Sequence, residues 1–160
     1  MKTKDEHALE AKDPYMLKVL LAYDNARTCR AMLDMLNRVS TRLRAQAQIN
    51  VNAFRFGLLE EMDPLQWPAA GQWSAELAVV AFGEAGLPGA GLLRWLENWG
   101  KCHAHKQAAL GLVPLAKLTS QSVRRIVRTL RATAARHGLD FIYDAASPLD
   151  LFQTRGTVVA

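Results

Sequence analysis

Polar side chains that could carry out chemistry lie directly after an apolar run near the start of the chain. Residues 16–23 read MLKVLLAY, and Asp24, Asn25, Arg27 and Thr28 follow them. A carboxylate can act as a functional acid, and the free backbone N–H groups at the start of a helix can bind an anion. Asp24 or Asn25 can instead cap that helix through a side-chain oxygen, which is the commoner role for these residue types. The four residues form our candidate ligand-binding group, with helix capping as the alternative for Asp24.

A second group of small and acidic residues follows another apolar run, residues 76–82. Gly83, Glu84 and Gly86 come directly after it. If the two runs are neighbouring parallel strands, the loops that follow them meet at one edge of the sheet, where ligands bind in such folds. We therefore expect Glu84 to join the candidate site of Asp24. The loop YDNART contains no glycine, so it matches neither a dinucleotide-binding fingerprint nor a phosphate-binding P-loop.

Cys102, His103 and His105 lie close together in the segment KCHAHK. Cysteine and histidine are zinc ligands, but a structural zinc site needs four of them. The other histidines, His7 and His137, do not form a second cluster in the sequence. We therefore expect a polar loop here and no metal site. No catalytic residue and no cofactor are expected either, because the predicted strand ends offer no Ser-His-Asp set, close carboxylate pair or phosphate loop.

The chain is basic, with 20 Lys and Arg against 15 Asp and Glu and a net charge of +5. Arg124, Arg128 and Arg131 recur at the spacing that puts them on one face of a helix. Such a stripe can bind phosphates or an acidic partner, and it can equally be a solvated helix face. The solvated face is the favoured interpretation. The three arginines are a candidate anion site, and nucleic-acid binding is an alternative that rests on charge alone.

Apolar runs alternate with segments of helical periodicity along the chain, and the runs are typical of strands buried on both faces of a parallel sheet. We predict strands at residues 16–23, 49–56, 76–82, 108–115 and 139–143. We predict helices at residues 25–44, 64–73, 92–99 and 120–137, with Gly100 and Gly138 ending the last two. The first helix presents apolar residues at three- and four-residue spacing, namely Cys29, Met32, Leu33, Leu36, Val39 and Leu43.

Strands joined by helical crossovers must run parallel, and such crossovers are right-handed in nearly all proteins. The commonest arrangement of five such strands has the order 2-1-3-4-5. We therefore predict a three-layer α/β fold with a five-stranded parallel sheet of that order. The first helix would lie on one face of the sheet and the other three on the opposite face.

The sheet face beside the first helix lacks a full fifth helix in this prediction. Seventeen residues follow Tyr143, and Pro148 and Gly156 interrupt them, so the fifth helix is short or missing. A sheet buried on both faces needs cover, and we therefore predict a homodimer that uses this face. The alternative is that residues 148–154 form a short fifth helix that covers it.

Length and composition are typical of one soluble domain, since 50% of the 160 residues are hydrophobic and 22% are charged. We expect a flexible N-terminal arm at residues 1–15 and a single α/β domain over residues 16–160. No apolar run reaches the ~18 residues of a membrane span, and the first residues lack the apolar core of a secretory signal. With Cys29 and Cys102 as the only cysteines, a cytoplasmic protein without membrane contact is expected.

The predicted strand ends resemble those of receiver domains of two-component response regulators, which share the flavodoxin-like strand order. The likeness spans about residues 17–145. Receivers hold an acidic pair after the first strand and a phosphoacceptor aspartate at the end of the third. This chain has Asp24 at the first place and Val-Ala-Phe, residues 80–82, at the second. The resemblance therefore implies a pseudo-receiver, which has the fold without aspartyl phosphorylation or its Mg²⁺ site.

These patterns favour a non-catalytic regulatory or protein-interaction module, with a homodimer or another protein as its partner. The chain also lacks the hydroxyl- and glycine-rich turn with which flavodoxins bind an FMN phosphate. The alternative is a small-molecule or nucleotide-binding protein, or an enzyme, that uses Asp24, Asn25, Arg27 and Glu84. The sequence alone supports the fold and does not select one activity.

Overall fold

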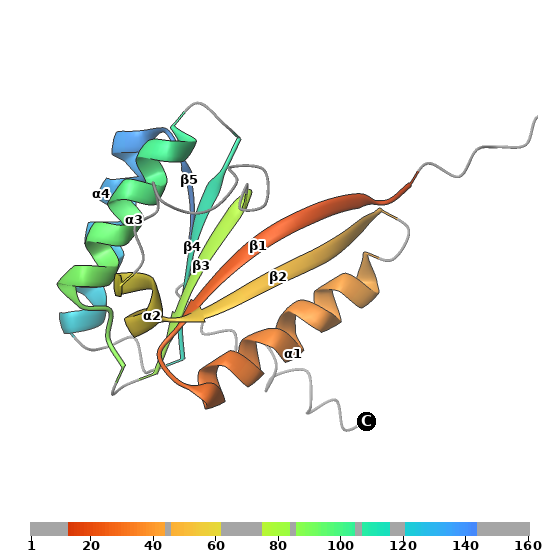
Figure 1. Cartoon of the computed structure of the whole chain (residues 1–160), viewed down its shortest axis with the longest axis horizontal. Helices are drawn as coiled ribbons and strands as arrows, with labels where there is room; N and C mark the ends of the chain where they lie inside the picture. The colour runs from red at the N-terminus through yellow and green to blue at the C-terminus, as the bar shows by residue number, and fades with distance from the viewer. Residues whose placement is uncertain are drawn as a thin grey trace, which may run out of the picture.

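The computed structural model describes residues 13–43, 46–61, 75–83, 86–104, 107–115 and 121–143, and the structural statements below concern these residues. Five strands form one parallel sheet (Figure 1). They are β1 Tyr15–Tyr23, β2 Ala47–Arg55, β3 Leu77–Phe82, β4 Ala109–Pro114 and β5 Asp140–Tyr143. Their order across the sheet is β2-β1-β3-β4-β5, and every neighbouring pair is parallel. The predicted fold class is therefore confirmed.

Helices cover both faces of the sheet. They are α1 Ala26–Arg42, α2 Phe56–Glu61, α3 Ala90–His103 and α4 Gln121–His137. Figure 1 shows α1 on one face and α2, α3 and α4 together on the opposite face, which is the predicted three-layer arrangement. Within the described part of the chain, no helix is long and apolar enough to cross a membrane.

Side chains of β1 alternate between two apolar cores, because successive residues of a strand point to opposite faces of the sheet. Val19 and Leu21 belong to the core under α1, together with Met32 of that helix. Leu20 and Ala22 belong to the larger core under α2, α3 and α4. All four β1 residues are at most 1% exposed. A strand buried on both faces must be apolar at nearly every position, which explains the continuous apolar run in the sequence.

The amino end of β1 extends beyond β3. β1 pairs with β2 from Tyr15 to Tyr23, but it pairs with β3 only from Val19, opposite Leu77. Among the described residues, 15–17 therefore have β2 as their only strand neighbour. Figure 1 shows this two-stranded end projecting from the rest of the sheet.

Helix α2 corrects the predicted end of the second strand. The sequence predicts a strand through Phe56, whereas β2 ends at Arg55 and Phe56 begins α2. Phe56 and Leu59 are both buried, at the three-residue spacing of one helix face. Only six residues carry this pattern, so the alternation of the preceding strand obscures it. The helix predicted at residues 64–73 lies outside the described residues.

Helix α3 continues through Gly100 to His103, beyond its predicted end at Trp99. Gly100 is therefore not a helix cap, and it leaves room for a neighbouring side chain instead. A Cβ atom at Gly100 would lie 2.7 Å from Cδ2 of His137 on α4, which is closer than packing permits. Gly138 does end α4 as predicted, with a positive φ of 66° that glycine adopts without strain.

The buried face of α1 differs in part from the predicted apolar stripe. Thr28 and Met32 are buried, and Met35 also packs against the core under this helix. Leu33 and Val39, which belong to the predicted stripe, are 40% and 39% exposed. Leu33 lies toward the outer edge of β2, where the described chain provides no further strand to pack against.

The face of the sheet beside α1 is only partly covered by described elements. Ile142 of β5 lies on this face and is 56% exposed. Residues 144–160, and with them the short fifth helix considered at 148–154, lie outside the described residues. Residues 1–12 of the predicted arm do so too. The predicted homodimer contact on this face therefore stays a prediction.

Glu97 on α3 connects that helix to the end of α4. Its Oε2 accepts a hydrogen bond from Nη2 of Arg136 at 2.7 Å, and its Oε1 lies 2.8 Å from Nε2 of His137. The hydrogen bond from Arg136 is the main cause that holds the pKa of Glu97 at about 2, below its ordinary value of 4.5. Burial acts in the opposite direction, and His137 adds to the lowering. The contact between α3 and α4 thus includes a stabilisation that depends on ionisation of Glu97.

We predict that Glu97→Gln lowers the free energy of unfolding by about 1 kcal/mol at neutral pH, because Arg136 is exposed and solvent screens the pair. The pKa of Glu97 is lowered in the folded state, so its contribution is complete above pH 4.5 and is lost as the pH falls toward about 2. Urea unfolding at several pH values should show that the two proteins differ less in free energy of unfolding as the pH falls over that range. Glu61→Gln, at an exposed position of α2, is the control and should change stability little. A difference that does not vary with pH would contradict this account.

Candidate functional site

The turn between β1 and α1 places Asp24 and Asn25 at the carboxyl end of β1. Asn25 caps α1, because its Oδ1 accepts from the backbone N–H of Thr28 at 3.1 Å and its carbonyl oxygen accepts from the N–H of Cys29 at 3.0 Å. Its backbone is extended, with φ −147° and ψ 169°, as is usual for an N-cap residue. Of the two residues that the sequence offers as a cap, Asn25 is the one that α1 uses.

Asp24 joins this turn to the loop after β3. Its Oδ2 accepts from the backbone N–H of Gly83 at 2.9 Å, and its Oδ1 accepts from the N–H of Asn25 at 2.8 Å. The side-chain amide of Asn25 also donates to Oδ2 at 3.2 Å. Hydrogen bonds to an ionised acceptor are stronger than those between neutral groups. The carboxylate therefore holds the loops after β1 and β3 together.

Gly86 packs directly against the Asp24 side chain. A Cβ atom at Gly86 would collide with Cβ, Cγ and Oδ2 of Asp24, so only glycine leaves enough room. The N–H of Gly86 donates to the carbonyl oxygen of Gly83 at 3.3 Å, which closes the turn around the carboxylate. The edge between β1 and β3, where the sequence predicts a ligand, is thus occupied in part by a side chain of the protein itself.

The remaining residues of the candidate ligand site have different surroundings. Arg27 is exposed in the first turn of α1, whereas Thr28 is 3% exposed. Glu84 lies outside the described residues. The structure therefore brings Asp24 and Asn25 to the loop after β3, and it places Thr28 in the protein interior. A ligand-binding role for Asp24, Asn25, Arg27, Thr28 and Glu84 stays a prediction.

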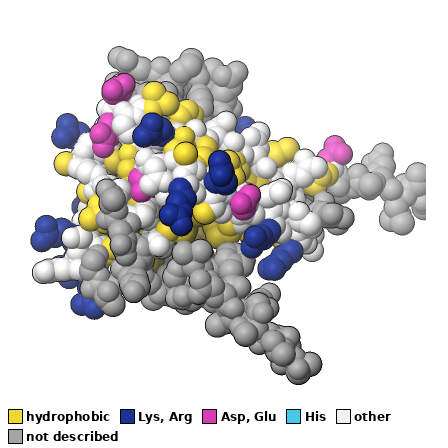
Figure 2. Space-filling model, turned by 90° about the horizontal axis from the view of Figure 1, so that it is seen from below, with side chains coloured by type: hydrophobic (Ala, Val, Ile, Leu, Met, Phe, Trp, Pro, Cys, Tyr) yellow, Lys and Arg dark blue, Asp and Glu magenta, His cyan; other side chains and the backbone are white. Residues whose placement is uncertain are grey.

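The three arginines of the candidate anion site are all exposed on α4. The guanidinium carbon of Arg131 lies 5.6 Å from the centroid of the Phe141 ring on β5, within the range of a cation–π contact. Figure 2 shows Lys and Arg side chains spread among acidic and hydrophobic ones on the face that it views, rather than gathered in one patch. Anion binding by Arg124, Arg128 and Arg131 stays a prediction.

The segment around Cys102 and His103 corrects the expectation of a polar loop. Both residues belong to the last turn of α3, and His103 is 7% exposed. The His103 ring stacks on Trp99 with 4.3 Å between centroids, and its Nδ1 lies 2.8 Å from the Trp99 carbonyl oxygen. Within the described ranges, no three His, Cys, Asp or Glu side chains gather as they would around a metal ion. The prediction of a loop was wrong because the buried face of α3 continues one turn past Trp99, with His103 at a position that an apolar residue usually occupies.

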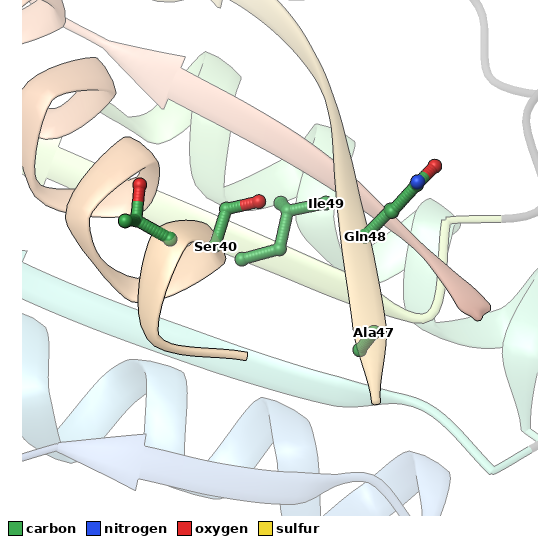
Figure 3. Close-up of a pocket in the computed structure, with 5 residues that line it drawn as sticks. Ser40, Ala47, Gln48 and Ile49 are labelled. Carbon is green, nitrogen blue, oxygen red and sulfur yellow. The ribbon is translucent and has the colours of Figure 1, made fainter. Parts of the chain in front are cut away.

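A groove runs between α1 and β2, and we call it the α1–β2 groove. In Figure 3, Ser40 of α1 and Ile49 of β2 point toward each other across it. One part has a volume of about 370 Å³ and is lined by Ser40, Thr41, Ala47, Gln48 and Ile49. The adjoining part has a volume of about 240 Å³ and is lined by Leu33, Leu36, Asn37, Ser40, Ile49 and Val51. Because Ser40 and Ile49 line both parts, the groove is continuous along β2.

Another cavity, of about 650 Å³, lies at the amino ends of the strands, away from Asp24. Polar side chains in its lining include Glu76, Gln107 and Asp140. None of the cavities described here is lined by Asp24, Asn25, Arg27 or Thr28.

Sequence reasoning did not single out the backbone N–H of Gly83 as the partner of Asp24, nor the α1–β2 groove. The available signal for the first was a pair of glycines directly after a buried strand. The signal for the groove was Leu33, which lies on the side of the apolar face of α1 farthest from Met35.

No known protein family matches the chain, and no curated protein matches it. Solved structures match at low sequence identity. A short-chain flavodoxin associated with a bacterial PDU microcompartment aligns with 10% identity and a TM-score of 0.53, over 89% of this chain and 93% of that one. The flavodoxin of Streptococcus pneumoniae TIGR4 aligns with 12% identity and a TM-score of 0.46, over 88% of this chain and 93% of that one.

Rubredoxin oxygen:oxidoreductase from Desulfovibrio gigas aligns with 13% identity and a TM-score of 0.48, over 89% of this chain and 34% of that one. The comparison with the short-chain flavodoxin establishes a flavodoxin-like fold. At 10% identity it establishes the fold alone, so the chemistry must be argued from the residues described above.

We predict that Asp24→Ala lowers the free energy of unfolding by about 1–3 kcal/mol, because the N–H groups of Gly83 and Asn25 lose their acceptor. Asp24→Asn keeps one acceptor oxygen, so its free energy of unfolding should fall by less. Urea unfolding measures both effects. Asp34→Ala, at an exposed position of α1, is the matched control and should stay within about 0.5 kcal/mol of the unaltered protein. Equal stability of Asp24→Ala and the unaltered protein would show that the carboxylate does not hold the two loops.

Proposed function

We propose that this protein is a non-catalytic protein-interaction module built on a flavodoxin-like fold. The observation that carries the proposal is the position of the Asp24 carboxylate, which accepts from the backbone N–H groups of Gly83 and Asn25. In sheets of this order, ligands bind beside the loops after the first and third strands. Here those loops are joined to each other through a side chain, so their hydrogen-bonding groups serve the fold.

FMN is the cofactor that this fold binds at the same edge in flavodoxins. Its phosphate would require backbone N–H donors and would carry negative charge to a place that already holds a carboxylate. The N–H groups of Gly83 and Asn25 are engaged by Asp24, and those of Thr28 and Cys29 are engaged by Asn25. A phosphate bound here would be repelled by the Asp24 carboxylate, and burial would strengthen the repulsion. These four N–H groups of the described residues are therefore not free to bind an FMN phosphate.

The end of β3 supports the pseudo-receiver interpretation. A receiver would hold its phosphoacceptor aspartate here, where this chain has Val80, Ala81 and Phe82. All three side chains are fully buried, with 0% exposure. Without a carboxylate at this position, Asp24 lacks the acidic partner that a receiver holds at the end of its third strand. The same fold then serves to present surfaces to other proteins, a use that many superfolds share.

We predict that FMN, riboflavin, ATP and Mg²⁺ leave the melting temperature unchanged, because a ligand raises it only by binding the native state. A thermal-shift titration with each compound measures this. Arg27→Ala provides the matched variant, since Arg27 is exposed and its removal should leave the fold intact. A saturable rise in melting temperature that Arg27→Ala removes would overturn the proposal and support a ligand-binding protein instead.

A further inference from the structure

In the described part of the chain, strand β2 is an edge of the sheet, and its own sequence lacks the usual protection against pairing. It is nine residues long, and within the described chain its only strand neighbour is β1. Edge strands are commonly protected by charged residues, proline or a bulge. Residues 47–54 of β2 contain no charge and no proline, and Arg55 stands only at its end. The strand therefore offers a long uncharged edge to another strand.

The side chains of β2 suit a copy of the same strand. Toward α1 it presents Ile49 and Val51, which are partly buried and line the α1–β2 groove. Toward the opposite face it presents Gln48, Asn50 and Asn52, which are exposed. Side-chain amides are both donors and acceptors, so amides on two copies can pair with each other. Both faces of the edge are thus self-complementary, one by apolar contact and the other by hydrogen bonding.

The α1–β2 groove adds apolar surface next to this edge. Leu33 is 40% exposed although its position in the stripe is that of a packed residue. It lines the groove together with Leu36 of α1 and Ile49 of β2. A neighbour on the outer side of β2 would cover these side chains. Burying apolar surface stabilises such a contact by a free energy of roughly 25 cal/mol per Å².

We propose that a second copy of this chain pairs with β2 across a twofold axis perpendicular to the sheet. Such an axis makes the two β2 strands antiparallel and keeps both α1 helices on the same face, so apolar side chains meet apolar ones. The register that overlaps the whole strand centres on Val51 and sets Asn50 opposite Asn52 of the copy. This register also places the two Arg55 residues at opposite ends of the paired strands, so their charges do not repel each other. This inference rests on the proposed function and names the partner for it.

The edge fits a second copy better than the sheet face predicted from the sequence. That face holds the exposed Asp140 beside Ile142, and the cavity next to them is also lined by Glu76. Bringing two copies together there would place carboxylates in the contact, and removing water from these charges costs free energy. The β2 edge contains no such charge between Ala47 and Phe54.

Sedimentation velocity over the micromolar range tests the proposal on the whole chain. The unaltered protein should form a dimer, and the double variant Asn50→Lys/Asn52→Lys should be a monomer, because lysines then face lysines across the axis. Both positions are exposed, so the monomer fold should survive, which circular dichroism checks. Gln121→Lys/Ser122→Lys adds the same charge at exposed positions of α4 and should remain a dimer.

A cysteine at the axis gives a second, independent measurement. In a background of Cys29→Ser and Cys102→Ser, Val51→Cys should form a covalent dimer on mild oxidation, because the two thiols would lie opposite each other. Ser122→Cys in the same background should not.

Two outcomes would overturn the proposal. One is a monomer for the unaltered protein, and the other is a dimer that persists in the double lysine variant and does not cross-link through residue 51. Neither outcome bears on the FMN titration, which tests the proposed function separately.

Discussion

The hydrogen bond from the Gly83 backbone N–H to the Asp24 carboxylate joins the loops after β1 and β3, the two paired strands on which the rest of the sheet depends. These two strands are neighbours in space although α1, β2 and α2 separate them in sequence. The chain turns to one side of this junction to form β2 and to the other to form β4 and β5. The bond therefore adds to the backbone pairing of β1 with β3 at the place where both halves of the sheet meet. It also means that any external anion must compete with a group that is covalently part of the protein.

The two faces of the sheet differ in how fully they are packed. On the side of α2, α3 and α4, large side chains such as Phe82, Leu96 and Leu130 are almost completely buried. On the side of α1, one helix serves the described sheet, and Leu33 and Ile142 are exposed on either side of it. Surfaces able to bind another protein are therefore expected around α1, because apolar surface already ordered by the fold costs little further entropy to bury.

The sequence predicted the fold well because β1 and β3 are buried on both faces, which forces continuous apolar runs at residues 16–23 and 76–82. It predicted the place of Asp24 for the same reason, since the loop after a strand is fixed by the strand. It could not predict the partner of Asp24, because a backbone N–H donor has no residue type to recognise. It failed at α2 because a six-residue helix carries too few apolar positions, and at Gly100 because only the tertiary contact with His137 explains that glycine.

The projecting end of β1 has a consequence for local stability. Among the described strands, residues 15–17 pair with β2 alone, whereas Val19 to Tyr23 have strands on both sides. Segments with fewer supporting contacts open without unfolding of the whole domain, so backbone amides of this end should exchange with solvent well before those at the centre of β1. If β2 pairs with a second copy, residues 47–49 gain a strand on their outer side, whereas residues 15–17 keep β2 as their strand neighbour. Assembly would then slow amide exchange along β2 and leave the projecting end of β1 the faster-exchanging strand of the pair.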